Sequence, residues 1–170
     1  MADSKRLHVL KRLTTFLEGI TVANGYAHGL AGRVSRGLSF VSAETPLPWV
    51  NIVENLNPDR NPLETNEGLI QRDDWILLVQ GWVETDEDDL YPADKAHALM
   101  ADVKRRLSRI IDPGDPTSRN PDYLLGGEIE GFLCEPGVVR PPDEISSTAY
   151  FYLRVVVELV EHLDDPSRLD

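Results

Sequence analysis

The sequence lacks the features on which several classes of protein depend. It has a single cysteine, Cys134, so it cannot form a disulfide within the chain, and the missing disulfide framework fits a reducing cytoplasm. No apolar run approaches the roughly 20 residues that cross a bilayer as a helix, so we expect no membrane association. No Cys/His zinc pattern is present, and no ligand spacing is shared by the four histidines, His8, His28, His97 and His162.

Catalytic and cofactor motifs are missing as well. The sequence has no Walker loop and no G-x-G-x-x-G, and the segment Gly32–Gly37 does not fit a nucleophile elbow because its serine is one position late. We interpret Cys134 as an inert thiol. We therefore predict that the chain is not an enzyme and that it has no catalytic residue, no cofactor and no metal.

Basic residues are scarce relative to acidic ones. The chain has 17 lysines and arginines against 29 acids, which gives a net charge of −12. A general nucleic-acid binder needs a basic footprint that neutralises phosphates, so this class is disfavoured. An acidic surface keeps a protein soluble, and it does not exclude a surface that DNA must pass without sticking. The 170 residues fit one domain, residues 1–170, which at this size buries about 70% of its unfolded surface.

The stretch Asp73–Ile111 organises what is present. Trp75–Val83 is apolar almost throughout, as in a strand that is buried on both faces. After an acidic turn, apolar residues recur in steps of three and four, which predicts a helix over Pro92–Ile111. The apolar stripe of that helix comprises Ala96, Leu99, Met100, Val103, Leu107, Ile110 and Ile111.

A first helix is predicted from an N-cap at Ser4 to about Glu18. Its basic residues are expected on the face opposite the apolar one, either in solvent or against a partner: Lys5, Arg6, Lys11 and Arg12. Another basic group falls in the second half of the helix over Pro92–Ile111, where cations suit the helix dipole. We interpret that group as helix stabilisation: Lys104, Arg105, Arg106 and Arg109.

The remaining segments predict strands and loops. Ala31–Phe40 indicates a weak edge strand and Leu47–Val53 a better one, and these two are expected to pair as a hairpin. A short strand around Ile129–Leu133 and a long strand within Thr148–Leu163 follow, the long one with a fully apolar inner face. Asn55–Asp73 is a long polar loop, either a binding loop or a tolerated insertion.

Together these elements predict an α+β fold: a mainly antiparallel sheet of four to five strands with two helices packed on one face. The second face then has little cover, and apolar residues exposed there indicate an interaction surface and hence an oligomer. The acidic turn Glu84–Asp89 is a solvated turn, a partner contact or a cation site, although it lacks the spacing of a calcium loop. The candidate interface residues are Arg33, Arg36, Asn57, Asp59, Arg60, Glu84, Asp86, Glu87, Asp88 and Asp89.

Five pieces in order carry a resemblance to a known family. They are a helix ending in Leu17-Glu18-Gly19-Ile20-Thr21, then Gly32-Arg33-Val34, Leu47–Ile52, Trp75–Val83, and the helix Ala96–Ile111 after an acidic turn. This pattern, over roughly Ser4–Ile111, resembles the tail terminator and minor tail proteins of long-tailed bacteriophages, the type represented by minor tail protein U of phage lambda.

The resemblance implies a small α+β virion subunit that assembles as a hexameric ring. Such a ring caps the tail tube, stops polymerisation of the tube protein and presents a surface to the head connector or neck protein, and DNA passes through it without specific binding. It belongs to the head-proximal end of the tail in the virion and to the host cytoplasm during assembly. Two alternatives stay open: a head–tail joining or head-closure protein, and a cytoplasmic oligomeric binding module with a small ligand between subunits.

Overall fold

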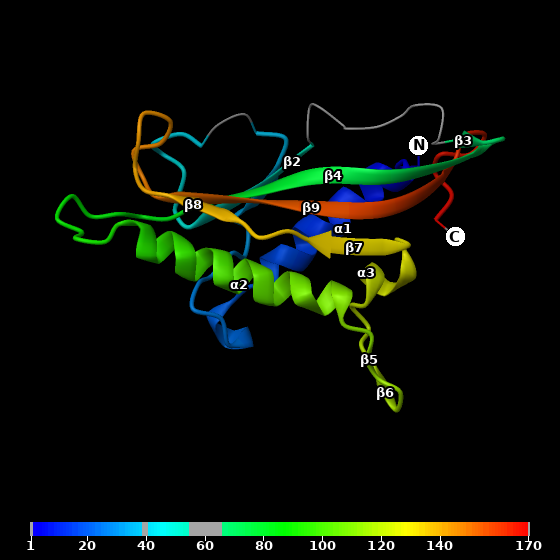
Figure 1. Cartoon of the computed structure of the whole chain (residues 1–170), viewed down its shortest axis with the longest axis horizontal. Coiled ribbons are helices and arrows are strands. Elements are labelled where there is room, and N and C mark those ends of the chain that lie inside the picture. Colours follow the sequence, from blue (N-terminus) through cyan, green and yellow to red (C-terminus); the bar gives the residue numbers. More distant parts are fainter. Residues whose placement is uncertain (1, 39–40, 55–65, 170) are drawn as a thin grey trace.

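Two long antiparallel strands, β4 (Ile70–Trp82) and β9 (Tyr150–His162), form the centre of the fold (Figure 1). In this computed structural model, which describes residues 2–38, 41–54 and 66–169, they pair without interruption from Ile70 opposite His162 to Trp82 opposite Tyr150. Both strands are rich in β-branched and aromatic residues, which suit a pleated surface. The long strand predicted within Thr148–Leu163 is confirmed.

The main path of the sheet runs β1-β2-β4-β9-β7, with β3 beside β4 and β8 beside β9. The bounds of the other strands are β1 Val34–Arg36, β2 Trp49–Glu54, β3 Asn66–Glu67, β7 Gly131–Cys134 and β8 Val138–Arg140. All pairings in this sheet are antiparallel except that of β1 with β2. The α+β class and the mainly antiparallel sheet are confirmed, with β3 and β8 as additional short strands.

The predicted hairpin between the first two strands is wrong. β1 and β2 run parallel, with Val34 opposite Val50 and Arg36 opposite Ile52. A hairpin needs a tight turn between its strands. β1 ends at Arg36 and β2 begins only at Trp49, so far more than a tight turn separates the two strands.

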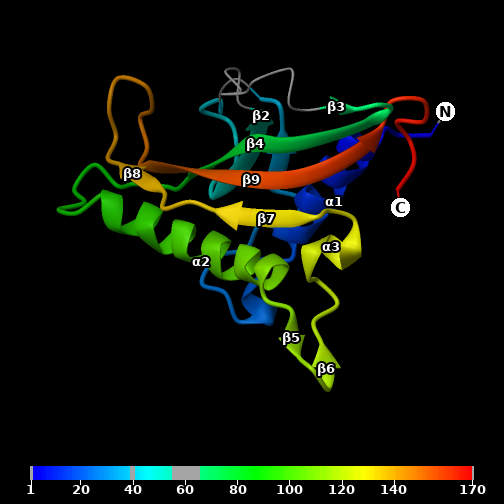
Figure 2. The same cartoon turned by 45° about the vertical axis from the view of Figure 1, so that its right-hand side comes forward.

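Two helices cover one face of the sheet, α1 (Lys5–Glu18) and α2 (Ala93–Ile111), as Figures 1 and 2 show. The Ser4 side chain accepts a hydrogen bond from the backbone N–H of Leu7, so the predicted N-cap of α1 is confirmed. Odd-numbered residues of β4 and β9 face these helices and form the core with the stripe of α2: Leu77, Val79, Leu153, Val155, Val157, Ala96, Leu99, Val103, Leu107 and Ile110.

The sequence left the basic residues of α1 either in solvent or against a partner, and the structure places two of them in contact with the rest of their own chain. Lys5 is buried, and Arg6 forms ion pairs with Asp73 and Glu161 and lies over the ring of Trp75. The predicted boundary at Asp73 is wrong, because β4 begins at Ile70 and carries Asp73 within it. Residues 66–73 were expected in a loop but belong to the β3–β4 hairpin instead.

Several short elements complete the fold. They are a 3-10 turn η1 (Val22–Asn24), the hairpin β5 (Gly114–Asp115) and β6 (Ser118–Arg119), and a short helix α3 (Leu124–Gly127). In Figure 2 the β5–β6 hairpin projects from the helix side of the molecule, below the C-terminal end of α2. Across the described ranges, the helices are all too short or too polar to span a membrane.

Candidate interaction surfaces

The face of the sheet opposite the helices, which we call the open sheet face, carries the even-numbered side chains of β4 and β9. Cross-strand pairing places Trp49, Trp82 and Tyr150 in one row, and Gln80 beside Tyr152 in the next. Tyr152 is 38% exposed, whereas Tyr150 is buried. Of the segments that the structure describes, only loops lie on this side (Figures 1 and 2). The undercovered second face that the sequence predicted is therefore present.

A cavity of about 360 Å³, the sheet cavity, lies on this face. Gln80, Trp82 and Tyr150 form its base, and residues 41–47 and 145–148 supply its walls. The Tyr150 hydroxyl donates a hydrogen bond to Asp143 (3.1 Å), a carboxylate that also accepts from the backbone N–H of Ile145. This bond from Ile145 holds the pKa of Asp143 below its usual value.

The pKa of Tyr150 moves in the opposite direction. Burial of the phenol raises it, and the hydrogen bond to Asp143 raises it further, because that bond needs the phenolic proton. Tyr150 therefore remains a neutral hydrogen-bond donor at the base of the sheet cavity. The cavity offers aromatic surface and a few polar groups, which suits a small organic ligand or a side chain from another protein.

The segment Glu84–Pro92, which we call the acidic loop, projects beyond the N-terminal end of α2 at the left of Figure 1. Lys95 of α2 fixes its shape through ion pairs with Asp89 (2.8 Å) and Asp86 (3.1 Å). The hydrogen bond from Lys95 lowers the pKa of Asp89, and Asp89 in turn raises the pKa of Lys95. Glu84, Glu87 and Asp88 have no cationic partner among the described residues.

The predicted interface residues fall into three groups. Glu84, Asp86, Glu87, Asp88 and Asp89 lie together on the acidic loop and are largely exposed. No cluster of three or more potential metal ligands occurs in the described part of the chain, so nothing in the structure favours the cation site.

Arg33, just before β1, and Arg36, at its end, lie at an edge of the sheet. Arg33 donates a hydrogen bond from Nη1 to the Leu47 carbonyl oxygen (2.8 Å), which ties the chain before β1 to the start of β2, whereas Arg36 is exposed. Asn57, Asp59 and Arg60 lie outside the described residues. The structure thus gathers the acidic residues on the acidic loop and leaves Arg33 and Arg36 apart from them, at the β1 edge of the sheet.

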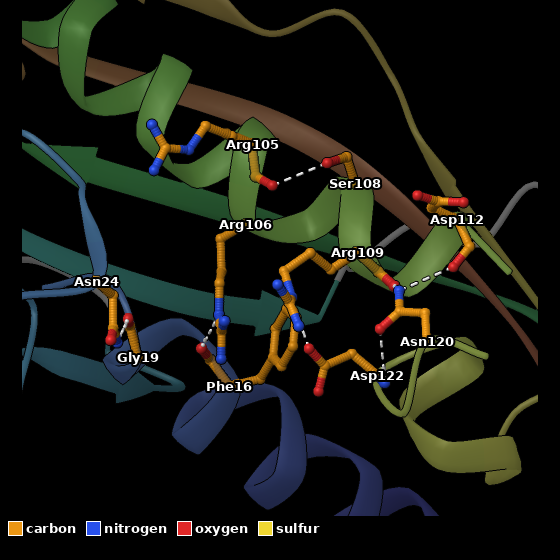
Figure 3. Close-up of polar contacts among 10 residues, drawn as sticks. All are labelled: Phe16, Gly19, Asn24, Arg105, Arg106, Ser108, Arg109, Asp112, Asn120 and Asp122. Carbon is orange, nitrogen blue, oxygen red and sulfur yellow. Dashed lines mark hydrogen bonds and ion pairs between the residues drawn. The ribbon is translucent and has the colours of Figure 1, made fainter. Parts of the chain in front are cut away.

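The second half of α2 forms a site that the sequence interpretation missed. Arg106 donates from Nε to the Phe16 carbonyl oxygen (2.8 Å), and its guanidinium lies 4.0 Å from the centroid of the Phe16 ring. Arg105 donates to the Gly25 carbonyl oxygen and covers the ring of Tyr26. These arginines connect α2 to the end of α1 and the following turn, and Figure 3 shows the contact of Arg106 with Phe16. Arg105 and Arg106 thus hold α2 against other elements of the fold, a role that the interpretation as helix stabilisation did not include.

Between α1, α2 and α3 these contacts border a depression of about 220 Å³, which we call the arginine groove. Its lining residues are Arg12, Thr15, Phe16, Arg106, Asp122 and Leu125. Asp122 is bound to Arg109 (2.6 Å), and Arg12 donates to the Leu125 carbonyl oxygen (3.0 Å) and pairs with Glu128. No periodicity in the sequence brings these residues together, since they come from α1, from α2 and from the segment that includes α3.

Comparisons with protein-family models and with curated proteins each found no match for this chain.

Proposed function

We propose that this chain is a structural subunit of a bacteriophage tail. In this proposal it assembles as a hexameric ring at the head-proximal end of the tail tube, stops polymerisation of the tube protein and provides the surface for head attachment. The ring acts by binding, without turnover. DNA passes through its lumen without specific binding, in keeping with the net charge of −12.

The observation that carries the proposal is the open sheet face. A sheet packed on one side normally presents a polar second side to water, with hydrophobic and polar residues alternating along each strand. Here one end of the second side instead has an aromatic row of buried or half-buried side chains, Trp49, Trp82 and Tyr150, with the exposed Tyr152 beside it. Such a surface, rimmed by polar residues, is typical of a protein–protein contact.

The order of elements supports the same proposal. Four of the segments that carry the resemblance to tail terminators correspond to real elements of the fold: α1, β2, β4 and α2. A pattern match over α1 to α2 is evidence of architecture, so the biological role rests on the experiment that follows.

The experiment is complementation of a phage whose copy of this gene is deleted. We expect wild-type protein to restore uniform tails, whereas Tyr152→Asp leaves overlong, uneven tubes, because a charge on the open sheet face prevents docking. The control is Leu169→Asp, which adds the same charge at a similarly exposed position of the C-terminal segment (43% against 38% exposed). Uniform tails with Tyr152→Asp and a folded protein would contradict the role of this face.

One observation favours a second candidate, the oligomeric binding module. The sheet cavity, about 360 Å³ with an aromatic base, lies within the size range of small-molecule sites. A thermal-shift screen of small metabolites separates the two candidates. Ligand-dependent stabilisation that Trp82→Ala abolishes would support the binding module, and uniform tails in the deleted phage would remove the phage proposal at the same time.

A further inference from the structure

We propose that the acidic loop of one subunit docks in the arginine groove of a second copy of this chain, as the head-to-tail contact of the assembly. This inference rests on the proposed ring and specifies which two surfaces build it. The contact is heterologous, because it joins two different patches, and heterologous contacts generate closed rings when the rotation between neighbours closes.

The acidic loop carries an apolar tip that its own chain does not cover. Leu90 is 79% exposed and Tyr91 is 66% exposed, and both follow directly after the acidic run. The ion pairs of Lys95 and the backbone hydrogen bond from Asp89 N–H to the Asp86 carbonyl oxygen (3.0 Å) hold the loop in one shape. A preformed loop loses less conformational entropy when it binds.

The arginine groove offers a matching receptor. Phe16 and Leu125 are buried in its base, and Arg12 and Arg106 stand at its rim. Its volume of about 220 Å³ is below the roughly 300 Å³ of small-molecule sites and suits one large side chain. An aromatic or aliphatic anchor in such a pocket, surrounded by polar residues, is the usual form of an interface hot spot.

The charges of the two surfaces complement each other. Arg106 in the groove and Arg105, its neighbour along α2, bind carbonyl oxygens and have no carboxylate partner among the described residues, although acids outnumber bases in the chain. On the acidic loop, Glu87 and Asp88 likewise lack a cation within the described part of the chain. Docking would place the surplus acids beside the surplus arginines, which favours this pairing over like-charged alternatives.

The geometry of α2 makes the contact intermolecular. The loop precedes Ala93, at the N-terminal end of the helix, whereas Arg106 lies thirteen residues further on. At 1.5 Å per residue the helix separates the two surfaces by about 20 Å. Figure 1 shows the loop at one end of α2 and α1 and α3 close to the other end. A rigid helix therefore keeps the loop away from the groove of its own chain and leaves each subunit with one donor and one receptor.

The test measures the molar mass of the pure protein against concentration by sedimentation and light scattering. The groove variant Thr15→Glu places a carboxylate at an exposed lining position, and the loop variant E87K/D88K reverses two charges. Each is expected to reduce self-association at least tenfold, and the combination is expected to restore it. E144K/D164K changes the net charge equally on other surfaces and is expected to associate as the wild type does.

The apolar tip has its own variant. Leu90→Ser is expected to weaken association with little effect on unfolding, and Leu69→Ser, at a position 59% exposed in the β3–β4 turn, serves as its matched control. Association that survives both the loop and groove variants would overturn the contact, as would a protein that remains monomeric up to about 1 mM, the weak end of specific binding.

Failure of the contact and failure of the proposed function give different results. If E87K/D88K fully complements the deleted phage and associates normally, the contact is wrong and the tail role stands. If the charge variants behave as expected in solution but the deleted phage makes uniform, joined tails, the contact is right and the tail role is wrong.

Discussion

Removal of the Arg6 side chain should destabilise the protein far more than loss of a surface charge. Arg6 pairs with Asp73, whose side chain is 1% exposed, and with Glu161 (2.7 Å). Breaking a buried ion pair costs about 3–5 kcal/mol. The Arg6 side chain is itself 29% exposed, so solvent screens part of this, and we expect Arg6→Met to cost about 2–4 kcal/mol in the free energy of unfolding.

The assay is urea unfolding followed by tryptophan fluorescence, with thermal unfolding as a second measure. For a chain of this length each kcal/mol lowers Tm by roughly 2–4 °C, so a decrease of roughly 4–16 °C is expected. An Arg6→Met variant that also carries Asp73→Asn and Glu161→Gln should recover most of the loss, because the cost arises from uncompensated buried charge.

The pH dependence of this stabilisation follows from the direction in which the pKa of Arg6 is shifted. Burial acts to lower its pKa, but the hydrogen bonds and charges of Asp73 and Glu161 outweigh burial and raise it. Because the pKa of Arg6 is raised in the folded protein, its ion pairs stabilise the fold fully at any pH below the ordinary pKa of arginine. This stabilisation is lost only as the pH rises through the raised pKa. The difference between wild type and Arg6→Met should thus stay constant from about pH 6 to about pH 9. If Arg6→Met lowers the free energy of unfolding by less than about 0.5 kcal/mol, as loss of an exposed ion pair does, Arg6 does not compensate buried charge.

Three further substitutions test the core and two polar contacts. Gly81→Ala places a methyl group against the ring of Phe151, closer than van der Waals contact allows, and should cost about 1–3 kcal/mol by denaturant unfolding. Gly29→Ala, with open space around it, should be close to neutral in the same assay. Asp102→Ala removes the carboxylate that accepts hydrogen bonds from the ring and the backbone N–H of His28. It should lower the free energy of unfolding by about 1–3 kcal/mol in the same assay. Asp143→Asn should lower Tm near neutral pH. The pKa of Asp143 is lowered by the hydrogen bond from the backbone N–H of Ile145, so the carboxylate stabilises the fold only while it is ionised. The difference in Tm between wild type and Asp143→Asn should therefore vanish as the pH falls through that lowered pKa.

Local periodicity was sufficient to predict the strongest elements. The helix expected over Pro92–Ile111 is α2, Ala93–Ile111, and the alternation within Thr148–Leu163 predicted the buried face of β9. Both patterns are long, so the face that each element buries is encoded in its own residues. The orientation of β1 against β2 is not encoded in this way, since the alternation within a strand does not say in which direction its neighbour runs.

The acidic loop and the arginine groove differ in the same way in how far the sequence predicts them. The acidic loop is visible in the sequence as a run of acids, but its apolar tip becomes informative only when Leu90 and Tyr91 prove to be exposed. The arginine groove could not be predicted, because Arg105 and Arg106 bind carbonyl oxygens 80 and 90 residues away along the chain. The contacts of Arg6 could not be predicted for the same reason: its partners come from strands far from α1 in sequence.

The most direct test of the tail role is the length of tails in a phage that lacks this gene, measured by electron microscopy of negatively stained particles. The proposed role predicts abnormally long tubes of uneven length, because nothing then stops polymerisation. Tails of normal length that fail to join heads would assign the protein to head–tail joining instead. Normal, infectious particles would contradict every virion role and leave the sheet cavity as the feature to pursue.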